Sequence, residues 1–182
     1  MRSKVMLLNP ARHFIANQAG LGYLTPLGLV LLGGPLLDAG FNVRLVDHDM
    51  NGWTIKRLLQ EVGEFQPKYI LLGHSGSTAS HNVAVATIKE IKKLFPHIRI
   101  VYGGVYPSYA YQTILADVPE IDVIVRGEGE KTIVDLLNCW EEDNDLGTVL
   151  GIAWRHASGI VVNHPQPAIQ NLDDYRPGWE LL

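Results

Sequence analysis

The sequence predicts an α/β fold in which a doubly wound, five-stranded parallel sheet carries helices on both faces. Short apolar runs alternate with helical patterns five times, and the connections between them are short. The apolar runs are continuous, which is typical of strands that are covered on both faces. Small residues follow several of these runs, where a strand would turn into a helix. We therefore expect a flavodoxin-like (Rossmann-like) sheet with the strand order 2-1-3-4-5.

Each element has its own justification in the sequence. The predicted strands are the apolar runs 4–8, 42–46, 68–72, 98–102 and 121–125. The predicted helices are 26–39, 53–65, 79–94, 107–116 and 128–140, with apolar residues three or four positions apart. Thr25 is expected to cap the first helix, Pro26 to occupy its first position and Gly40 to end it. Ser77 or Thr78 is expected to cap the third helix.

The character of the sequence changes after residue 147. Two apolar runs, 149–155 and 160–163, flank Ala157-Ser158-Gly159 and predict a β-hairpin. The segment that follows contains three prolines and ends in Trp179-Glu180-Leu181-Leu182, with no later residues to pack against. We therefore divide the chain into a Rossmann-like domain (1–146), a hairpin appendage (147–164) and a linker toward a further domain (165–182).

Composition restricts the classes of function. The 182 residues carry a net charge of −4 with no long basic run, so no nucleic-acid partner is expected. The single cysteine, Cys139, excludes a disulfide framework and an iron–sulfur centre built from cysteines of this chain. The apolar stretch 21–37 is broken by Pro26, Gly33, Gly34 and Pro35, so we expect a buried helix and no membrane span. No signal peptide is visible, which predicts a cytoplasmic location.

Four loops that follow predicted strands carry the candidate site residues. The carboxyl ends of parallel strands meet at one edge of the sheet, and open α/β sheets bind ligands there. Glycines in these loops would allow a large ligand to approach the backbone closely. Because the loops offer no evident catalytic base, they predict binding and no catalytic residue. The candidate binding residues are Asp47, Asp49, Asn51 and Gly52 after strand two; Ser75, Gly76, Ser77 and Thr78 after strand three; Gly103, Gly104 and Val105 after strand four; and Arg126, Gly127, Glu128 and Gly129 after strand five.

Other chemistries fit the same residues less well. Residues 73–77 come close to the nucleophile elbow of serine hydrolases, with Ser75 in the nucleophile position. The last position is serine instead of glycine, and neither Asp122 nor the later histidines stand where such a triad needs them. A flavin site would need a hydroxyl-rich loop after the first strand, which is absent. The run from Asp47 to Gly52 offers few and consecutive ligands, so no metal-binding residue is predicted.

Several motifs, in their order and spacing, resemble those of a known family. They are Asn9-Pro10, Thr25-Pro26-Leu27-Gly28-Leu29, Asp47 to Gly52, Ser75 to Thr78, Gly103-Gly104 with Pro107, Arg126-Gly127-Glu128-Gly129-Glu130, Gly151-Ile152-Ala153-Trp154-Arg155 and the tail 172–179. Nearly the whole chain resembles the N-terminal cobalamin-binding domain of radical-SAM enzymes. The resemblance is to the branch of these enzymes that includes the anaerobic magnesium-protoporphyrin IX monomethyl ester cyclase and class B methyltransferases. The resemblance implies a module that holds cobalamin for a separate radical-SAM barrel, with a tetrapyrrole as one candidate substrate.

The sequence departs from the wider cobalamin-binding family at the cobalt ligand. That family carries Asp-x-His-x-x-Gly, whose histidine binds cobalt, whereas here Asp49 stands at the ligand position and His48 one place earlier. The resemblance to the radical-SAM branch therefore implies cobalamin held without a protein histidine. It also implies a displaced nucleotide tail, buried among the loops after strands three and four. Ser75, Ser77 and Thr78 would then hydrogen-bond to that tail.

A second departure is the missing Cys-x-x-x-Cys-x-x-Cys motif. The iron–sulfur cluster and S-adenosylmethionine would therefore belong to another domain, and this chain would not be catalytic alone. The alternative is an interaction or structural domain that keeps the fold and holds no cofactor.

Overall fold

The structure, a computed structural model, describes residues 2–11, 25–73 and 78–182. A seven-stranded sheet with the order β2-β1-β3-β4-β5-β6-β7 forms its centre. The first five strands run parallel, whereas β6 and β7 are antiparallel to their neighbours. The strands are β1 (Lys4–Asn9), β2 (Asn42–Asp47), β3 (Tyr69–Gly73), β4 (Arg99–Gly103), β5 (Val123–Val125), β6 (Ile152–His156) and β7 (Gly159–Val162).

The sheet has seven strands and not the expected five, because the two strands of the predicted hairpin, β6 and β7, continue the sheet beyond β5. Strand β6 pairs with β5, with Val125 opposite Ile152. Ile152 and Ala153 are fully buried, one in each of the two cores described below. The guanidinium of Arg155 donates to the backbone carbonyls of Leu115 and Pro119, at 2.8 Å each. Buried side chains and these hydrogen bonds therefore join the hairpin to the rest of the domain.

Six helices of the described chain accompany the sheet. They are α2 (Leu27–Asp38), α3 (His48–Asn51), α4 (Ile55–Phe65), α5 (Thr78–Leu94), α6 (Val105–Asp117) and α7 (Glu130–Glu141), with the short 3₁₀ turns η1 (Leu146–Thr148), η2 (Leu172–Asp174) and η3 (Trp179–Leu181). None of the helices in the described residues is long and apolar enough to cross a membrane.

Two helix starts differ from the sequence-based expectation. The side chain of Thr25 does not cap α2; its N-cap position is Pro26, which has no side-chain hydrogen-bond donor or acceptor to offer. The segment after β2, expected as a polar loop, contains α3, because the Asp47 carboxylate accepts a hydrogen bond from the Met50 amide at 3.0 Å. The expected cap of α5 by Ser77 lies outside the described residues, as does the side chain of Thr78.

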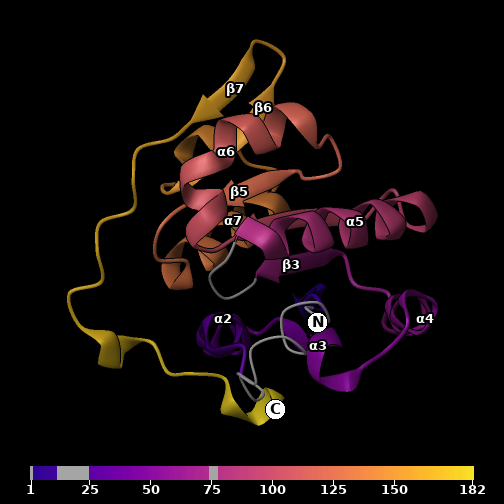
Figure 1. Cartoon of the computed structure of the whole chain (residues 1–182). Helices are drawn as coiled ribbons and strands as arrows, with labels where there is room; N and C mark the ends of the chain where they lie inside the picture. The colour runs from indigo at the N-terminus through magenta and orange to yellow at the C-terminus, as the bar shows by residue number, and fades with distance from the viewer. Residues whose placement is uncertain (1, 12–24, 74–77) are drawn as a thin grey trace.

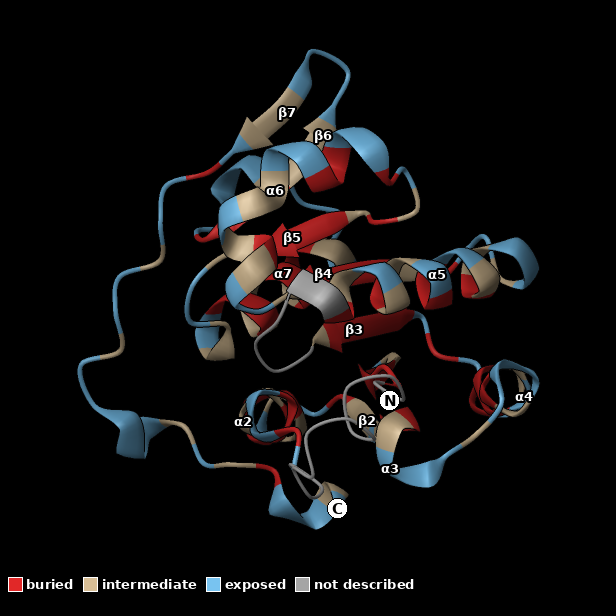
Figure 2. Ribbon diagram, viewed as in Figure 1, coloured by how far each residue is buried: buried red, intermediate tan, exposed pale blue. Residues whose placement is uncertain are grey.

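Each face of the sheet carries its own apolar core. Along β1, Val5 and Leu7 pack toward α2 and α7, whereas Met6 and Leu8 pack toward α4, α5 and α6. All four side chains are fully buried, as the alternation of a strand requires when helices cover both faces. Figure 2 shows the buried strands between helices whose outer sides are exposed.

The C-terminal tail, expected to be a linker without a clear element, returns to α2 and packs against it. It runs along the outside of the domain from β7, so that the C-terminus lies near α2 (Figure 1). The Gly178 amide donates to the Val30 carbonyl at 2.8 Å, and Leu181 packs against the core under α2. Arg176 forms an ion pair with Asp38 at 2.8 Å. We call residues 176–182 the tail strap.

Candidate functional site

The loops after the parallel strands meet at the carboxyl edge of the sheet. The register places Asn9 opposite Asp47, and Gly73 opposite Gly103. Asn9 and Asp47 are both buried, and the Asn9 amide donates to the Asp47 carboxylate at 2.9 Å. This hydrogen bond joins the ends of β1 and β2. The same carboxylate caps α3, so it also fixes the start of that helix to the end of β2. The direction in which successive strands are added to the sheet reverses between β1 and β3. Open α/β sheets bind ligands at such a switch point.

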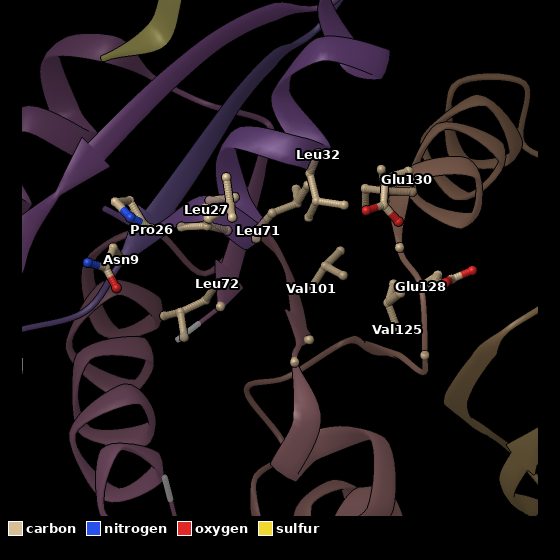
Figure 3. A pocket seen from close by; sticks show the side chains of 18 residues that line it. Asn9, Pro26, Leu27, Leu32, Leu71, Leu72, Val101, Val125, Glu128 and Glu130 are labelled. Atoms are coloured by element: carbon tan, nitrogen blue, oxygen red, sulfur yellow. The ribbon is translucent and has the colours of Figure 1, made fainter. Parts of the chain in front are cut away.

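A cavity of about 240 Å³ opens at this edge, between the first turns of α2 and α7 (Figure 3). Its α2 wall consists of apolar side chains, among them Leu29 and Leu32. Leu71, Val101 and Val125 form its floor on the sheet. The described side chains that line it include no lysine, arginine or histidine. The cavity therefore suits an apolar group that enters edge-on against the sheet.

Two glycines at the rim have backbone conformations that favour glycine. The φ angle is 112° at Gly104 and 78° at Gly127, a region that other residues rarely adopt. Ser108, which the sequence analysis missed, joins these two loops. Its hydroxyl donates to the Gly104 carbonyl at 2.8 Å and accepts a hydrogen bond from the Gly127 amide at 3.0 Å. This bridge fixes the loop after β4 relative to the loop after β5.

The two carboxylates of the last loop have different surroundings. Glu128 is exposed, and its Oε2 accepts a hydrogen bond from the Ile169 amide of the tail at 2.7 Å. Glu130 begins α7, and its carboxylate lies at the cavity beside Leu32 and Val125 (Figure 3). Its Oε2 is buried and has no hydrogen-bond partner among the described residues.

The structure brings only part of the predicted set to the cavity. Five predicted residues line it: Gly103, Gly104, Gly127, Glu128 and Gly129. The other predicted residues with described positions do not line it: Asp47, Asp49, Asn51, Gly52, Thr78, Val105 and Arg126. Ser75, Gly76 and Ser77 lie outside the described residues. Asn9, Glu130 and the α2 wall also line the cavity and were not among the predicted site residues, although the apolar character of 27–32 on all sides of a helix indicates burial there.

Two histidines near this edge already take part in hydrogen bonds. His48 is buried in α3, and its Nε2 donates to the Trp53 carbonyl at 2.8 Å. His81, in the first turns of α5, lies 3.2 Å from the Tyr102 hydroxyl through Nδ1. Burial lowers the pKa of His81 and so favours its neutral form. Neither ring lines the cavity.

The hydrolase alternative finds no support in the described residues. The Asp122 carboxylate accepts a hydrogen bond from the Ile100 amide at 2.7 Å and pairs with Lys92 at 3.0 Å. Asp122 directly precedes β5, so it lies at the amino edge of the sheet, whereas β3 ends with Gly73 at the carboxyl edge. A triad built at the carboxyl edge could not use Asp122 as its acid.

Comparison with known sequences identifies the family. Residues 15–137 match the B12 binding domain. The chain is 42% identical over 179 residues to the anaerobic magnesium-protoporphyrin IX monomethyl ester cyclase of Synechocystis sp., covering 98% of this chain and 36% of that protein. It is 30% identical over 183 residues to the cyclase of the same name from Cereibacter sphaeroides, covering 98% of this chain and 29% of that protein. The chain thus spans about a third of the length of these relatives.

Comparison with solved structures agrees at the level of the fold. The radical S-adenosylmethionine methyltransferase TsrM from Kitasatospora setae, solved with cobalamin and a 4Fe–4S cluster bound, superposes with a TM-score of 0.77 at 22% identity. The superposition covers 97% of this chain and 31% of that one. Since the family match extends over more than half of the sequence, the chain belongs to the B12-binding domain family, whose cofactor is cobalamin.

Proposed function

We propose that this chain is the module that holds cobalamin in a radical-SAM enzyme of the cyclase or methyltransferase type. The corrin ring would lie over the carboxyl edge of the sheet, and the nucleotide tail would enter the cavity between α2 and α7. The cavity carries this proposal. At about 240 Å³ it is smaller than the roughly 300–1,000 Å³ of pockets that enclose a complete small-molecule ligand. It therefore suits one part of a large cofactor.

The residues at the edge fit cobalamin by their chemistry. An apolar floor and an apolar α2 wall suit the flat, methylated base of the nucleotide tail. Gly103 and Gly104 line the cavity and present no side chain at the end of β4, so the base could approach the backbone closely there. The remaining predicted residues after β2, β3 and β5 would border the ring and the tail from the rim. When bound, the cofactor would supply a reactive cobalt centre to a neighbouring catalytic domain.

We further propose that no protein histidine binds cobalt. The position that the wider family gives to its histidine ligand holds Asp49, in α3. His48 is buried and donates to the Trp53 carbonyl, so its Nε2 is already engaged within the protein. Carboxylate is a poorer ligand than imidazole for cobalt of this kind. Cobalt would therefore keep its lower face free of a nitrogen from this chain.

The activity of the whole enzyme is also a proposal. The relatives are about three times as long, which supports a radical-SAM domain that would supply the iron–sulfur cluster and bind S-adenosylmethionine. Residues 165–182 would lead toward that domain. The similarity to the magnesium-protoporphyrin cyclases favours a tetrapyrrole as the substrate of the whole enzyme. The match to these relatives covers 98% of this chain, at 42% and 30% identity.

A titration with hydroxocobalamin, followed by desalting and an absorption spectrum, tests the binding proposal. Gly28 lines the cavity from α2, and a Cβ there would meet no atom within 4 Å. Gly28→Phe should therefore fold and fill the cavity, whereas Gly28→Ala is a matched control that leaves it open. We expect retention by the wild type and by Gly28→Ala, and loss in Gly28→Phe. A folded wild type that retains no cobalamin would favour the cofactor-free alternative.

A further inference from the structure

The buried Oε2 of Glu130 is a polar feature that the otherwise apolar lining of the cavity leaves unexplained. A buried oxygen without a hydrogen-bond partner costs free energy, more so when it is ionised. The dipole of α7 accounts for a carboxylate in the first turn of the helix. It does not account for the inward direction of this side chain, because Glu130 could interact with the same dipole from the solvent side.

No donor among the described lining residues is placed to satisfy this oxygen. Asn9 lies at the opposite end of the cavity, and its amide already donates to Asp47 (Figure 3). The described side chains that line the cavity include no cationic group, and Glu128 adds a second carboxylate at the rim. A phosphate inside this cavity is therefore disfavoured, whereas a neutral group that brings its own O–H donor is favoured.

We propose that Glu130 accepts a hydrogen bond from a ribose hydroxyl of the nucleotide tail and so selects corrinoids that carry this tail. This inference rests on the proposed function. The base of the tail offers apolar surface to Leu29, Leu32 and Val101, and the ribose attached to it carries a free hydroxyl. With the base against the apolar floor, the ribose hydroxyl would face the α7 end of the cavity, where Oε2 of Glu130 has no hydrogen-bond partner among the described residues. Glu130 is then a specificity-determining residue for the tail, while the rim loops hold the ring.

The test compares two corrinoids on variants of the full chain. Hydroxocobalamin carries the nucleotide tail, and cobinamide has the same ring without it. Glu130→Ala should weaken hydroxocobalamin binding by about tenfold to a hundredfold, the range for a hydrogen bond to a charged acceptor. It should leave cobinamide binding unchanged. Glu130→Gln, whose amide oxygen still accepts a hydrogen bond, should lose less, and it also carries the test if Glu130→Ala fails to fold.

Asp135→Asn is the matched control, because it removes a negative charge from the same helix, where Asp135 pairs with Lys131 at the surface. It should bind both corrinoids as the wild type does. Equal weakening of both corrinoids by Glu130→Ala, or no weakening of hydroxocobalamin, would overturn the inference while leaving the proposed function intact. A folded wild type that binds neither corrinoid would overturn the proposed function, and this inference with it.

Discussion

Replacing Gly34 by alanine should detach the tail strap from α2. A Cβ at Gly34 would overlap the Arg176 carbonyl oxygen and lie 2.8 Å from the carbonyl carbon. Both atoms belong to the backbone, so no rotation of a side chain relieves the clash. Gly33 offers the matched control, because its Cβ would meet only the end of the flexible Leu181 side chain at close range.

The contacts of the strap give the magnitude. Detachment loses the hydrogen bond from Gly178 to Val30, about 1 kcal/mol, and the burial of Leu181, about 1–2 kcal/mol. Alanine in place of a helical glycine returns about 1 kcal/mol at Gly33, but less at Gly34, because its Cβ would also crowd the ring of Pro35. Gly34→Ala should therefore lower the free energy of unfolding by about 1–3 kcal/mol relative to the wild type, while Gly33→Ala should match or exceed the wild type.

Urea denaturation measures this difference, and hydrogen–deuterium exchange locates it. The Gly178 amide should exchange fast in Gly34→Ala and stay protected in Gly33→Ala, because its hydrogen bond reports the docked strap. Equal stability and equal protection in the two variants would refute the reasoning, since it rests on the backbone clash alone.

Two further predictions concern hydrogen bonds away from the cavity. Burial opposes ionisation of Glu141, but hydrogen bonds from Lys68 and Tyr69 outweigh it and lower the pKa to about 2, from an ordinary value of 4.5. A lowered pKa in the folded state stabilises the protein above pH 4.5. This contribution, about 1 kcal/mol because solvent screens the exposed Glu141, is lost as the pH falls from 4.5 toward 2. Glu141→Gln should therefore flatten the acid side of the stability–pH curve in that window, and an unchanged slope in acid denaturation would contradict the assignment. Ser108→Ala should cost about 1 kcal/mol and speed exchange of the Gly127 amide, and undiminished protection there would show that the serine does not hold the loop.

Apolar runs predicted the parallel part of the sheet well, because strands buried on both faces need continuous apolar sequence. The run 4–8, for example, corresponds to β1 over Lys4–Asn9. The common position of the loops at the carboxyl edge could be predicted from the parallel strands, since such strands bring their carboxyl ends together. Five predicted residues therefore line the cavity.

The remaining features depend on contacts between distant parts of the chain. The hairpin joins the sheet through Ile152, and nothing in its local sequence distinguishes this from a separate appendage. The tail strap docks because Gly34 leaves room for the backbone around Arg176, a match between positions far apart in the sequence. The inward direction of Glu130 likewise depends on the packing of α7 against α2, because a glutamate at a helix start usually faces solvent.

The most direct test of the central claim is the electron paramagnetic resonance spectrum of the reduced complex, with cobalt in the Co(II) state. The protein would be prepared with and without nitrogen-15 in its histidines. A nitrogen bound below cobalt splits the spectrum, and its isotope changes the splitting from a triplet to a doublet. We predict retained cobalamin whose spectrum shows no axial nitrogen splitting and is the same in both preparations. A splitting that changes with the histidine label would place a histidine of this chain on cobalt and contradict the account.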